Sequence, residues 1–209
     1  MHNSEYDFLY ESLRKNPKIL VVCTGNICRS PMGEIVVRSY LEKADLGGYV
    51  SVESCGVSAE EKGNPIYGDA AQVLREAGYD VGKHYAMQVS DNQLRESGLI
   101  LAMTTGHAYS LRQRMLLMGE DIRRIHLWKE CDGTLSFAPY GCFGEGGFLS
   151  GELNGGNSKA SVFAQMYISD GSGDVPDPWM RGRRAFEETL ECIEAGAYSV
   201  VKMVRSCFS

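Results

Sequence analysis

Ile19-Leu-Val-Val22 leads directly into Cys23-Thr-Gly-Asn-Ile-Cys-Arg-Ser-Pro31. A short apolar run that ends in a glycine-containing loop and then a helical pattern is typical of a strand–loop–helix unit in an α/β protein. Ser30-Pro31 combines residue types that favour a helix N-cap and first turn, so we predict a helix immediately after the loop. The loop should therefore lie at the carboxyl edge of a parallel sheet, where such proteins bind ligands.

Apolar runs and helical patterns continue to alternate along the chain. Further apolar runs occupy 50–54, 99–103 and 125–128, and helical patterns occupy 32–44, 69–77 and 107–118. A last amphipathic stripe has apolar residues at steps of three and four, namely Phe186, Leu190, Ile193, Ala197, Val200 and Val204. Together these patterns predict an α/β fold, a doubly wound four-stranded parallel sheet flanked by helices, with a phosphate-binding loop after strand 1.

The length of 209 residues favours a single domain, which we assign to residues 18–209. Residues 1–17 form an N-terminal extension, either a docked helix or a variable appendage. A glycine-rich insertion at about 132–173 has no clear period. A segment of that length is expected to be a lid, a binding loop or disordered.

The composition excludes several classes of partner. A formal net charge of −6 and a pI of about 5.3 leave no broad basic face, which argues against nucleic acid. Residues 1–17 form neither a secretory signal nor a membrane span, which predicts a cytoplasmic protein with no membrane partner. The seven cysteines are odd in number and lack zinc spacing, so we expect reduced thiols and no metal site.

The loop has the residues of an anion-binding site with a nucleophile. Backbone N–H groups from Thr24 to Arg29 can curl round one phosphate, reinforced by the dipole of the following helix. The same donors and the nearby guanidinium favour the thiolate of Cys23, which makes it the predicted catalytic nucleophile. Arg29 offers a planar fork that matches two phosphoryl oxygens. The alternative is a buried cysteine after a strand with a surface arginine nearby.

Other loop residues have supporting roles. Gly25 permits a tight turn, Asn26 can hold the loop through side-chain hydrogen bonds, and the Ser30 hydroxyl can donate to the sulfur as it departs from phosphocysteine. We expect phosphate and other oxyanions to bind in this loop. The predicted substrate-binding residues are Thr24, Gly25, Asn26, Ile27, Cys28, Ser30 and Trp179.

Cysteine attack on a phosphate ester requires an acid to protonate the leaving oxygen. The best candidate is Asp177 in Asp174-Val-Pro-Asp-Pro-Trp179, where two prolines stiffen the segment and Trp179 adds a flat apolar wall. A helix cap or turn residue is the alternative interpretation of Asp177. Asp170 and Asp174, which lie next to glycines, are interpreted as flexible loop.

These stretches resemble the low-molecular-weight protein tyrosine phosphatases, the class II cysteine-based phosphatases. Cys23 to Pro31 is similar to their signature loop and Asp177-Pro178-Trp179 to their general-acid loop. The resemblance covers about 18–131 and 174–205. It implies that Cys23 is the nucleophile, that Arg29 binds phosphate, and that Asp177 acts first as acid and then as base for water. No metal ion or organic cofactor is implied.

The resemblance also implies roles for two further residues, and this chain departs from the family's pattern in two places. It implies a protective disulfide between Cys28 and Cys23. His84 is similar to a histidine that braces the loop asparagine, although a purely structural histidine is the alternative. The aromatic residue often found on the opposite rim of the family's cleft has no counterpart in Ser58-Ala-Glu-Glu-Lys62, and the insertion is an addition.

We therefore predict a phosphatase that hydrolyses phosphotyrosine in proteins through phosphocysteine. A protein-arginine phosphatase is the nearest rival, but its loop has threonine where this chain has Ile27. Arsenate reductase would need further reactive cysteines and would leave Asp177 without a role. A catalytically weak phosphate-binding module is the rival from another class. The insertion enters just before Asp177 and carries aromatic residues, so we expect it to line or cover the cleft.

Overall fold

The computed structural model describes residues 6–151 and 171–209. Its helices and strands are α1 (Asp7–Lys15), β1 (Lys18–Cys23), α2 (Arg29–Lys43), β2 (Ser51–Gly56), α3 (Gly68–Glu76), α4 (Asp91–Glu96), β3 (Leu99–Ala102), α5 (Thr105–Leu117), η2 (Ile122–Arg124), β4 (Ile125–Leu127), α6 (Trp128–Cys131) and α8 (Arg183–Phe208).

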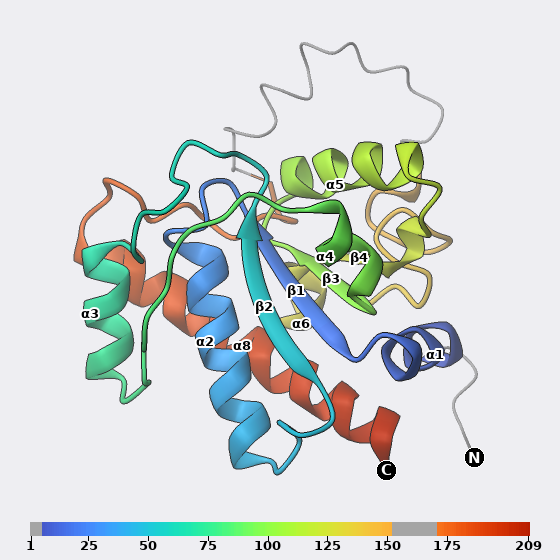
Figure 1. Ribbon diagram of the computed structural model, residues 1–209, viewed down its shortest axis with the longest axis horizontal. Coiled ribbons are helices and arrows are strands. Elements are labelled where there is room, and N and C mark those ends of the chain that lie inside the picture. Colours follow the sequence, from blue (N-terminus) through green and yellow to red (C-terminus); the bar gives the residue numbers. More distant parts are fainter. Residues whose placement is uncertain (1–5, 152–170) are drawn as a thin grey trace.

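The strands form one parallel sheet in the order β2-β1-β3-β4 (Figure 1). β1 lies inside the sheet, paired with β2 along its whole length and with β3 from Ile19 to Val22. The chain moves to one side of β1 for β2 and to the other side for β3 and β4. The carboxyl end of β1 is therefore a switch point of the topology, the place where open α/β sheets bind ligands.

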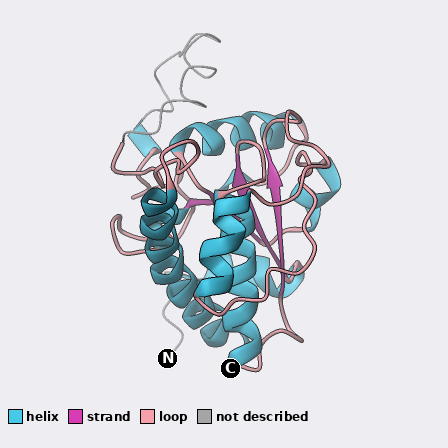
Figure 2. Cartoon of the chain, turned by 90° about the vertical axis from the view of Figure 1, so that its left-hand side faces the viewer, coloured by secondary structure: helices cyan, strands magenta, loops and turns pink. Residues whose placement is uncertain are grey.

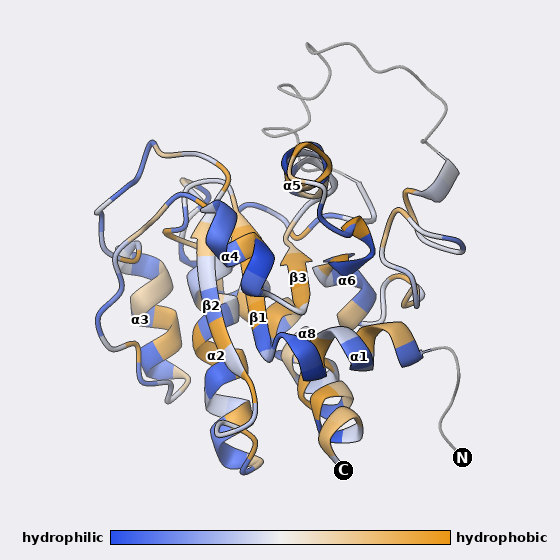
Figure 3. Ribbon diagram, turned by 45° about the vertical axis from the view of Figure 1, so that its right-hand side comes forward, coloured by the Kyte–Doolittle hydropathy of each residue, from blue (hydrophilic) through white to orange (hydrophobic). Residues whose placement is uncertain are grey.

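Helices cover both faces of the sheet, which confirms the predicted doubly wound architecture (Figure 2). Ile19, Val21 and Cys23 belong to a core shared with α2, α3 and α8. Leu20 and Val22 belong to a second core with α4 and α5. Because both faces of the sheet are buried at its centre, β1 from Ile19 onward and β3 are continuously apolar rather than alternating. Figure 3 shows β3 in orange, whereas β2, at the edge of the sheet, also carries polar residues.

The start of α2 differs from the sequence prediction, and one short helix was not predicted. α2 begins at Arg29, with Cys28 as its N-cap and no side-chain cap bond, so the assignment of Ser30 as N-cap is wrong. The Ser30 hydroxyl is instead occupied by Cys23 and Asn26. The short helix α4 was not predicted, although Ser90 and Gln93 form a capping box at its start.

The N-terminal segment includes a docked helix, one of the two alternatives for residues 1–17. Leu9 and Leu13 of α1 are fully buried. Ser12 Oγ donates to the carbonyl of Gly98, just before β3, at 2.8 Å. Arg14 Nη2 donates to the carbonyl of Cys207 at 2.8 Å, which ties α1 to the end of α8. α1 thus packs near the amino ends of the strands, away from the loop that follows β1 (Figure 1).

The first part of the glycine-rich segment, residues 132–151, packs beside β4 and α5. The N–H of Cys142 donates to the carbonyl of Ile125 at 2.8 Å, and Cys142, Phe143 and Leu149 are buried in the second core. Gly141, with φ of 76°, approaches the backbone of Arg123 so closely that a Cβ atom would clash. Residues 152–170, including Phe163 and Tyr167, lie outside the described residues.

Candidate active site

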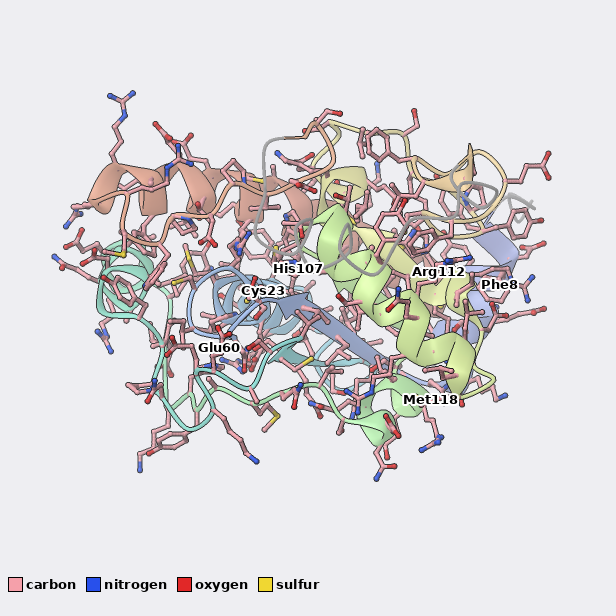
Figure 4. All side chains as sticks on the ribbon, turned by 90° about the horizontal axis from the view of Figure 1, so that it is seen from above. Phe8, Cys23, Glu60, His107, Arg112 and Met118 are labelled. Carbon is pink, nitrogen blue, oxygen red and sulfur yellow. The ribbon has the colours of Figure 1, made fainter. Side chains whose placement is uncertain are left out.

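A cavity of about 150 Å³ opens at the carboxyl end of β1. Its walls come from the loop after β1, the loop after β2 and the segment before α8. Figure 4 shows Cys23 at the tip of β1, with His107 on the side of α5 and Glu60 on the opposite side. The lining residues are Cys23, Thr24, Gly25, Ile27, Cys28, Arg29, Glu60, Glu61, Asp177 and Trp179.

The thiol of Cys23 lies at the floor of the cavity and is 3% exposed. The backbone N–H of Asn26 donates to Cys23 Sγ at 3.3 Å, and Ser30 Oγ lies 3.0 Å from the same sulfur. Both groups can donate a hydrogen bond to a thiolate. The sulfur is therefore placed as a nucleophile would be, at the centre of a curled loop with donors behind it.

Asn26 and Ser30 brace the loop from behind rather than lining the cavity. Asn26 is fully buried, and its φ of 60° is a left-handed conformation that asparagine tolerates. Its Nδ2 donates to Ser30 Oγ at 3.0 Å and to Ser54 Oγ at 2.9 Å. His84 Nε2 donates to the Asn26 carbonyl at 2.7 Å, which confirms the expectation that His84 braces this asparagine.

The end of β2 supports the loop by backbone contact. The N–H of Val57 donates to the carbonyl of Cys23 at 2.9 Å, and that of Ser58 donates to the carbonyl of Thr24 at 3.0 Å. A Cβ atom on Gly56 would collide with that Thr24 carbonyl. Only glycine at this position lets the loop lie so close to β2.

Arg29 connects the loop to the segment before α8. Its guanidinium donates from Nη2 to Asp177 Oδ2 at 2.7 Å and from Nη1 to the carbonyl of Val175 at 3.3 Å. Nη2 also lies 3.5 Å from Thr24 Oγ1. The side chain is 5% exposed, so its charge is held at the wall of the cavity rather than in solvent. The predicted phosphate clamp and the predicted acid therefore meet at one cavity.

Both interpretations of Asp177 describe part of its geometry. Oδ1 accepts a hydrogen bond from the N–H of Trp179 at 3.2 Å, as a turn residue does. Oδ2 contacts Arg29 at the cavity, and the side chain is 43% exposed. Trp179, which is half exposed, adds the apolar wall expected from the sequence.

Two buried side chains next to the site, Asp174 and His107, were not predicted from the sequence. Asp174, interpreted as flexible loop, is 5% exposed, and its Oδ1 accepts the N–H of Thr105 at 2.7 Å. His107 is fully buried, with Nε2 2.9 Å from Thr24 Oγ1. Thr105 and His107 follow β3, which neighbours β1. Their place at the carboxyl edge of the sheet could therefore have indicated that they lie near the site. Asp170 lies outside the described residues.

The part of the cavity rim that comes from the loop after β2 is acidic. Glu60 and Glu61, from the stretch 58–62 that lacks an aromatic residue, line this part of the cavity, and Glu61 Oε2 accepts a hydrogen bond from Asn64 Nδ2 at 2.7 Å. No residue of 132–151 lines the cavity. The expectation that the insertion lines the cleft is therefore not met by its described first part, because that part packs on β4 and α5.

All seven cysteines are free thiols. Burial raises the pKa of Cys28, and the neighbouring Cys23 contributes to the same shift. Cys28 is thus a poor thiolate while it stays buried. The disulfide between Cys28 and Cys23 stays a prediction.

A thiol nucleophile at the start of an anion-binding loop and an arginine at its end, at the switch point of a parallel sheet, define the class of cysteine-dependent phosphatases. A model of the low molecular weight phosphotyrosine protein phosphatase family matches residues 18–136. This chain belongs to that family.

The relatives support the assignment over most of the chain. A low molecular weight protein-tyrosine-phosphatase of Streptomyces coelicolor is 30% identical over 188 residues, which cover 90% of this chain and 93% of the relative. The crystal structure of YfkJ from Bacillus subtilis has a TM-score of 0.66 at 25% identity and covers 90% and 94% of the two chains. Wzb of Vibrio vulnificus, solved with benzylphosphonate, has a TM-score of 0.63 at 26% identity and covers 89% and 97%.

Proposed function

We propose that this phosphatase hydrolyses phosphotyrosine in proteins through a phosphocysteine on Cys23. The observation that carries the proposal is the convergence of Cys23, Arg29 and Asp177 on one cavity with an aromatic wall. We assign the activity to a single domain of residues 18–209, with residues 1–17 as an extension and about 132–173 as an insertion.

In the first step, the Cys23 thiolate attacks phosphorus, the S–P bond forms and the bond from phosphorus to the phenolic oxygen breaks. Loop N–H groups and Arg29 bind the phosphoryl oxygens, where negative charge must be stabilised. Asp177 gives its proton to the departing phenolate. Because Arg29 contacts Asp177 Oδ2 directly, phosphate binding to the guanidinium replaces that contact and leaves the carboxyl facing the leaving oxygen.

In the second step, a water molecule attacks phosphorus and the S–P bond breaks. Asp177, now ionised, takes the proton from that water. The sulfur leaves as a thiolate, and Ser30 Oγ, 3.0 Å away, is placed to donate a hydrogen bond to it. Inorganic phosphate and the free thiolate are the products, and no metal ion or organic cofactor takes part in this proposal.

The depth and the wall of the cavity favour an aryl phosphate. Cys23 lies at the floor and Trp179 at the rim, so a substrate must carry its phosphate on a long group that can lie against an aromatic face. Wzb is described in complex with benzylphosphonate, which combines an aromatic ring with a tetrahedral oxyanion. Phosphotyrosine has both features, and phosphate or related oxyanions alone should occupy the loop.

Phosphoarginine is a second candidate substrate because the rim is acidic. Glu60 and Glu61 would attract a guanidinium, which phosphotyrosine lacks. Ile27 weighs against this candidate, since it adds bulk to the loop and has no hydroxyl to position water. We therefore rank phosphotyrosine first.

The decisive test is steady-state hydrolysis of matched phosphotyrosine and phosphoarginine peptides. We expect a kcat/KM at least tenfold higher for phosphotyrosine. Cys23→Ser should abolish turnover yet still bind vanadate, because the backbone loop and Arg29 remain. Appreciable turnover by Cys23→Ser would falsify the covalent mechanism, and a preference for phosphoarginine would replace the proposed substrate.

We also propose a cytoplasmic location and no nucleic-acid or membrane partner. Within 6–151 and 171–209, no helix has the length and apolar character needed to cross a membrane. The seven free thiols fit a reducing compartment, and the net charge of −6 disfavours polyanions.

A further inference from the structure

The first turn of α5 lies between the two loops that carry the catalytic groups. It follows β3, whose carboxyl end lies beside that of β1. Thr104 is its N-cap and accepts the N–H of His107 at 3.2 Å. Thr104 is 2% exposed and His107 is fully buried, so the turn is a rigid part of the core rather than a surface segment.

One contact joins this turn to the loop that follows β1, residues 23–29, which we call the nucleophile loop. His107 Nε2 lies 2.9 Å from Thr24 Oγ1, and Thr24 Oγ1 lies 3.5 Å from Arg29 Nη2. Burial, together with the charge of Arg29, lowers the pKa of His107 well below its usual value. The ring is therefore neutral at physiological pH and places no second positive charge beside the guanidinium.

Two contacts hold the acid loop, residues 174–179, one to the first turn of α5 and one to the residue just after β3. Asp174 Oδ1 accepts the N–H of Thr105, the first residue of α5, at 2.7 Å. The N–H of Val175 donates to the carbonyl of Met103, at the end of β3, at 2.8 Å. Asp174 and Val175 come just before Asp177, so these bonds fix where the acid loop leaves the body of the protein.

We propose that the first turn of α5 sets the position of the acid loop relative to the nucleophile loop, with Asp174 and His107 as positioning residues. This inference rests on the proposed function. Neither residue lines the cavity, and each acts through another group. Asp174 acts through the loop that carries Asp177, and His107 acts through Thr24 and Arg29.

The two positioning residues should leave different kinetic signatures. Displacement of Asp177 weakens protonation of the leaving group, so the loss in kcat/KM should grow as the leaving group becomes more basic. Displacement of Thr24 and Arg29 weakens binding of the phosphoryl oxygens, so all aryl phosphates should lose kcat/KM equally. A merely structural role would lower the fraction of active enzyme. It would change neither the dependence of kcat/KM on the leaving group nor the affinity for oxyanions.

The acid-loop arm is tested with Asp174→Ala, Asp174→Asn and Thr105→Pro. Asparagine keeps an oxygen acceptor, whereas alanine removes it. Thr105→Pro removes the donor N–H at the first helical position, where proline fits, and the extended Thr104 before it is compatible with proline. We expect kcat/KM for phenyl phosphate to fall about tenfold in the alanine and proline variants, the effect of one hydrogen bond. The loss for p-nitrophenyl phosphate should be smaller, and Asp174→Asn should stay near wild type.

The phosphate arm is tested with His107→Ala, His107→Gln and Thr24→Val. We expect the inhibition constant of vanadate to rise about tenfold in His107→Ala and Thr24→Val, with the leaving-group dependence unchanged. His107→Gln offers an amide oxygen near the position of Nε2 and should recover most of the affinity. Urea unfolding of every variant verifies that the fold is retained.

The outcomes separate this inference from the proposed function. A wild-type enzyme that does not hydrolyse aryl phosphates overturns the function itself. An active wild type whose Thr105→Pro and Asp174→Ala variants keep the normal leaving-group dependence overturns the positioning role of Asp174. Likewise, wild-type vanadate affinity in His107→Ala and Thr24→Val overturns the role of His107. A full loss of activity in Asp174→Asn would make Asp174 itself the acid.

Discussion

Asp177 divides its two oxygens between a turn and the cavity. Oδ1 holds the N–H of Trp179, and Oδ2 faces Arg29. Asp174 is a second carboxyl only three residues before Asp177. Its Oδ1 accepts the N–H of Thr105, and Asp174 does not line the cavity. Glu60 and Glu61 do line the cavity, and the direct contact between Asp177 and Arg29 is what favours Asp177 as the acid.

Asp177→Asn should therefore lower kcat/KM for phosphotyrosine by about 10²- to 10⁴-fold, the usual contribution of general acid catalysis. The amide keeps the turn bond to Trp179 but cannot supply a proton. Good leaving groups such as 4-nitrophenolate should suffer less. Hydrolysis of an aryl phosphate series measures this difference, and a loss below threefold for phosphotyrosine would assign the acid to another group.

At the scale of elements, the glycine-rich segment has a part that belongs to the core. Phe143 is 3% exposed, and the centre of its ring lies 5.3 Å from that of Tyr109. The guanidinium of Arg112 also lies 5.3 Å from the centre of the Phe143 ring. Residues 132–151 thus cover β4 and α5, as a secondary-structure element would. Deleting residues 140–151 would open this core, so the role of the segment must be tested with point changes.

Phe143→Ala should destabilise the fold by about 3 kcal/mol or more, because a buried aromatic side chain leaves a cavity. For a protein of this length, that corresponds to a fall in Tm of about 10 °C. Tyr140→Ala is the matched control, since Tyr140 is 42% exposed, and should cost below about 1 kcal/mol. Thermal unfolding by circular dichroism gives both values, and equal losses would contradict the packing described for Phe143.

At the scale of the whole molecule, a buried neutral histidine couples stability to pH. The folded-state pKa of His107 lies well below its usual value, because burial and Arg29 disfavour the charged ring. The unfolded chain should titrate near the ordinary value of about 6.5. Below that pH the unfolded state binds a proton that the folded state does not, so His107 makes stability fall as pH falls.

Wild type should lose stability between pH 7.5 and 5.5 more steeply than His107→Gln, by up to about 1.4 kcal/mol per pH unit below 6.5. The glutamine cannot titrate, so the difference between the two proteins isolates this one group. Urea unfolding across the pH range measures it. Parallel stability curves for the two proteins would mean that the pKa of His107 is the same in the folded and unfolded states, which contradicts the lowered value.

Local patterns were enough to predict the sheet, the loop after β1 and three residues that meet at one cavity. Cys23 and Arg29 belong to one loop, and Asp177 lies in a short proline-stiffened segment, so each could be proposed as a site residue from its immediate neighbours. The prediction of Ser30 as a helix cap was wrong for the same reason. Its hydroxyl is used by Cys23 and Asn26, and that competition is visible only when the loop is folded.

The parallel sheet and the segments that meet at the cavity could be predicted from the amino-acid sequence, because apolar periodicity and loop composition act over a few residues. The folded structure was needed to find that Asp174 and His107 are buried beside the site and that Glu60 and Glu61 line its cavity. Asp174 and His107 contact residues that are far away in the sequence. His107 and Thr24, for example, are separated by 83 residues. Burial and hydrogen-bond partners at that range depend on how the strands are ordered, and no local pattern encodes that order.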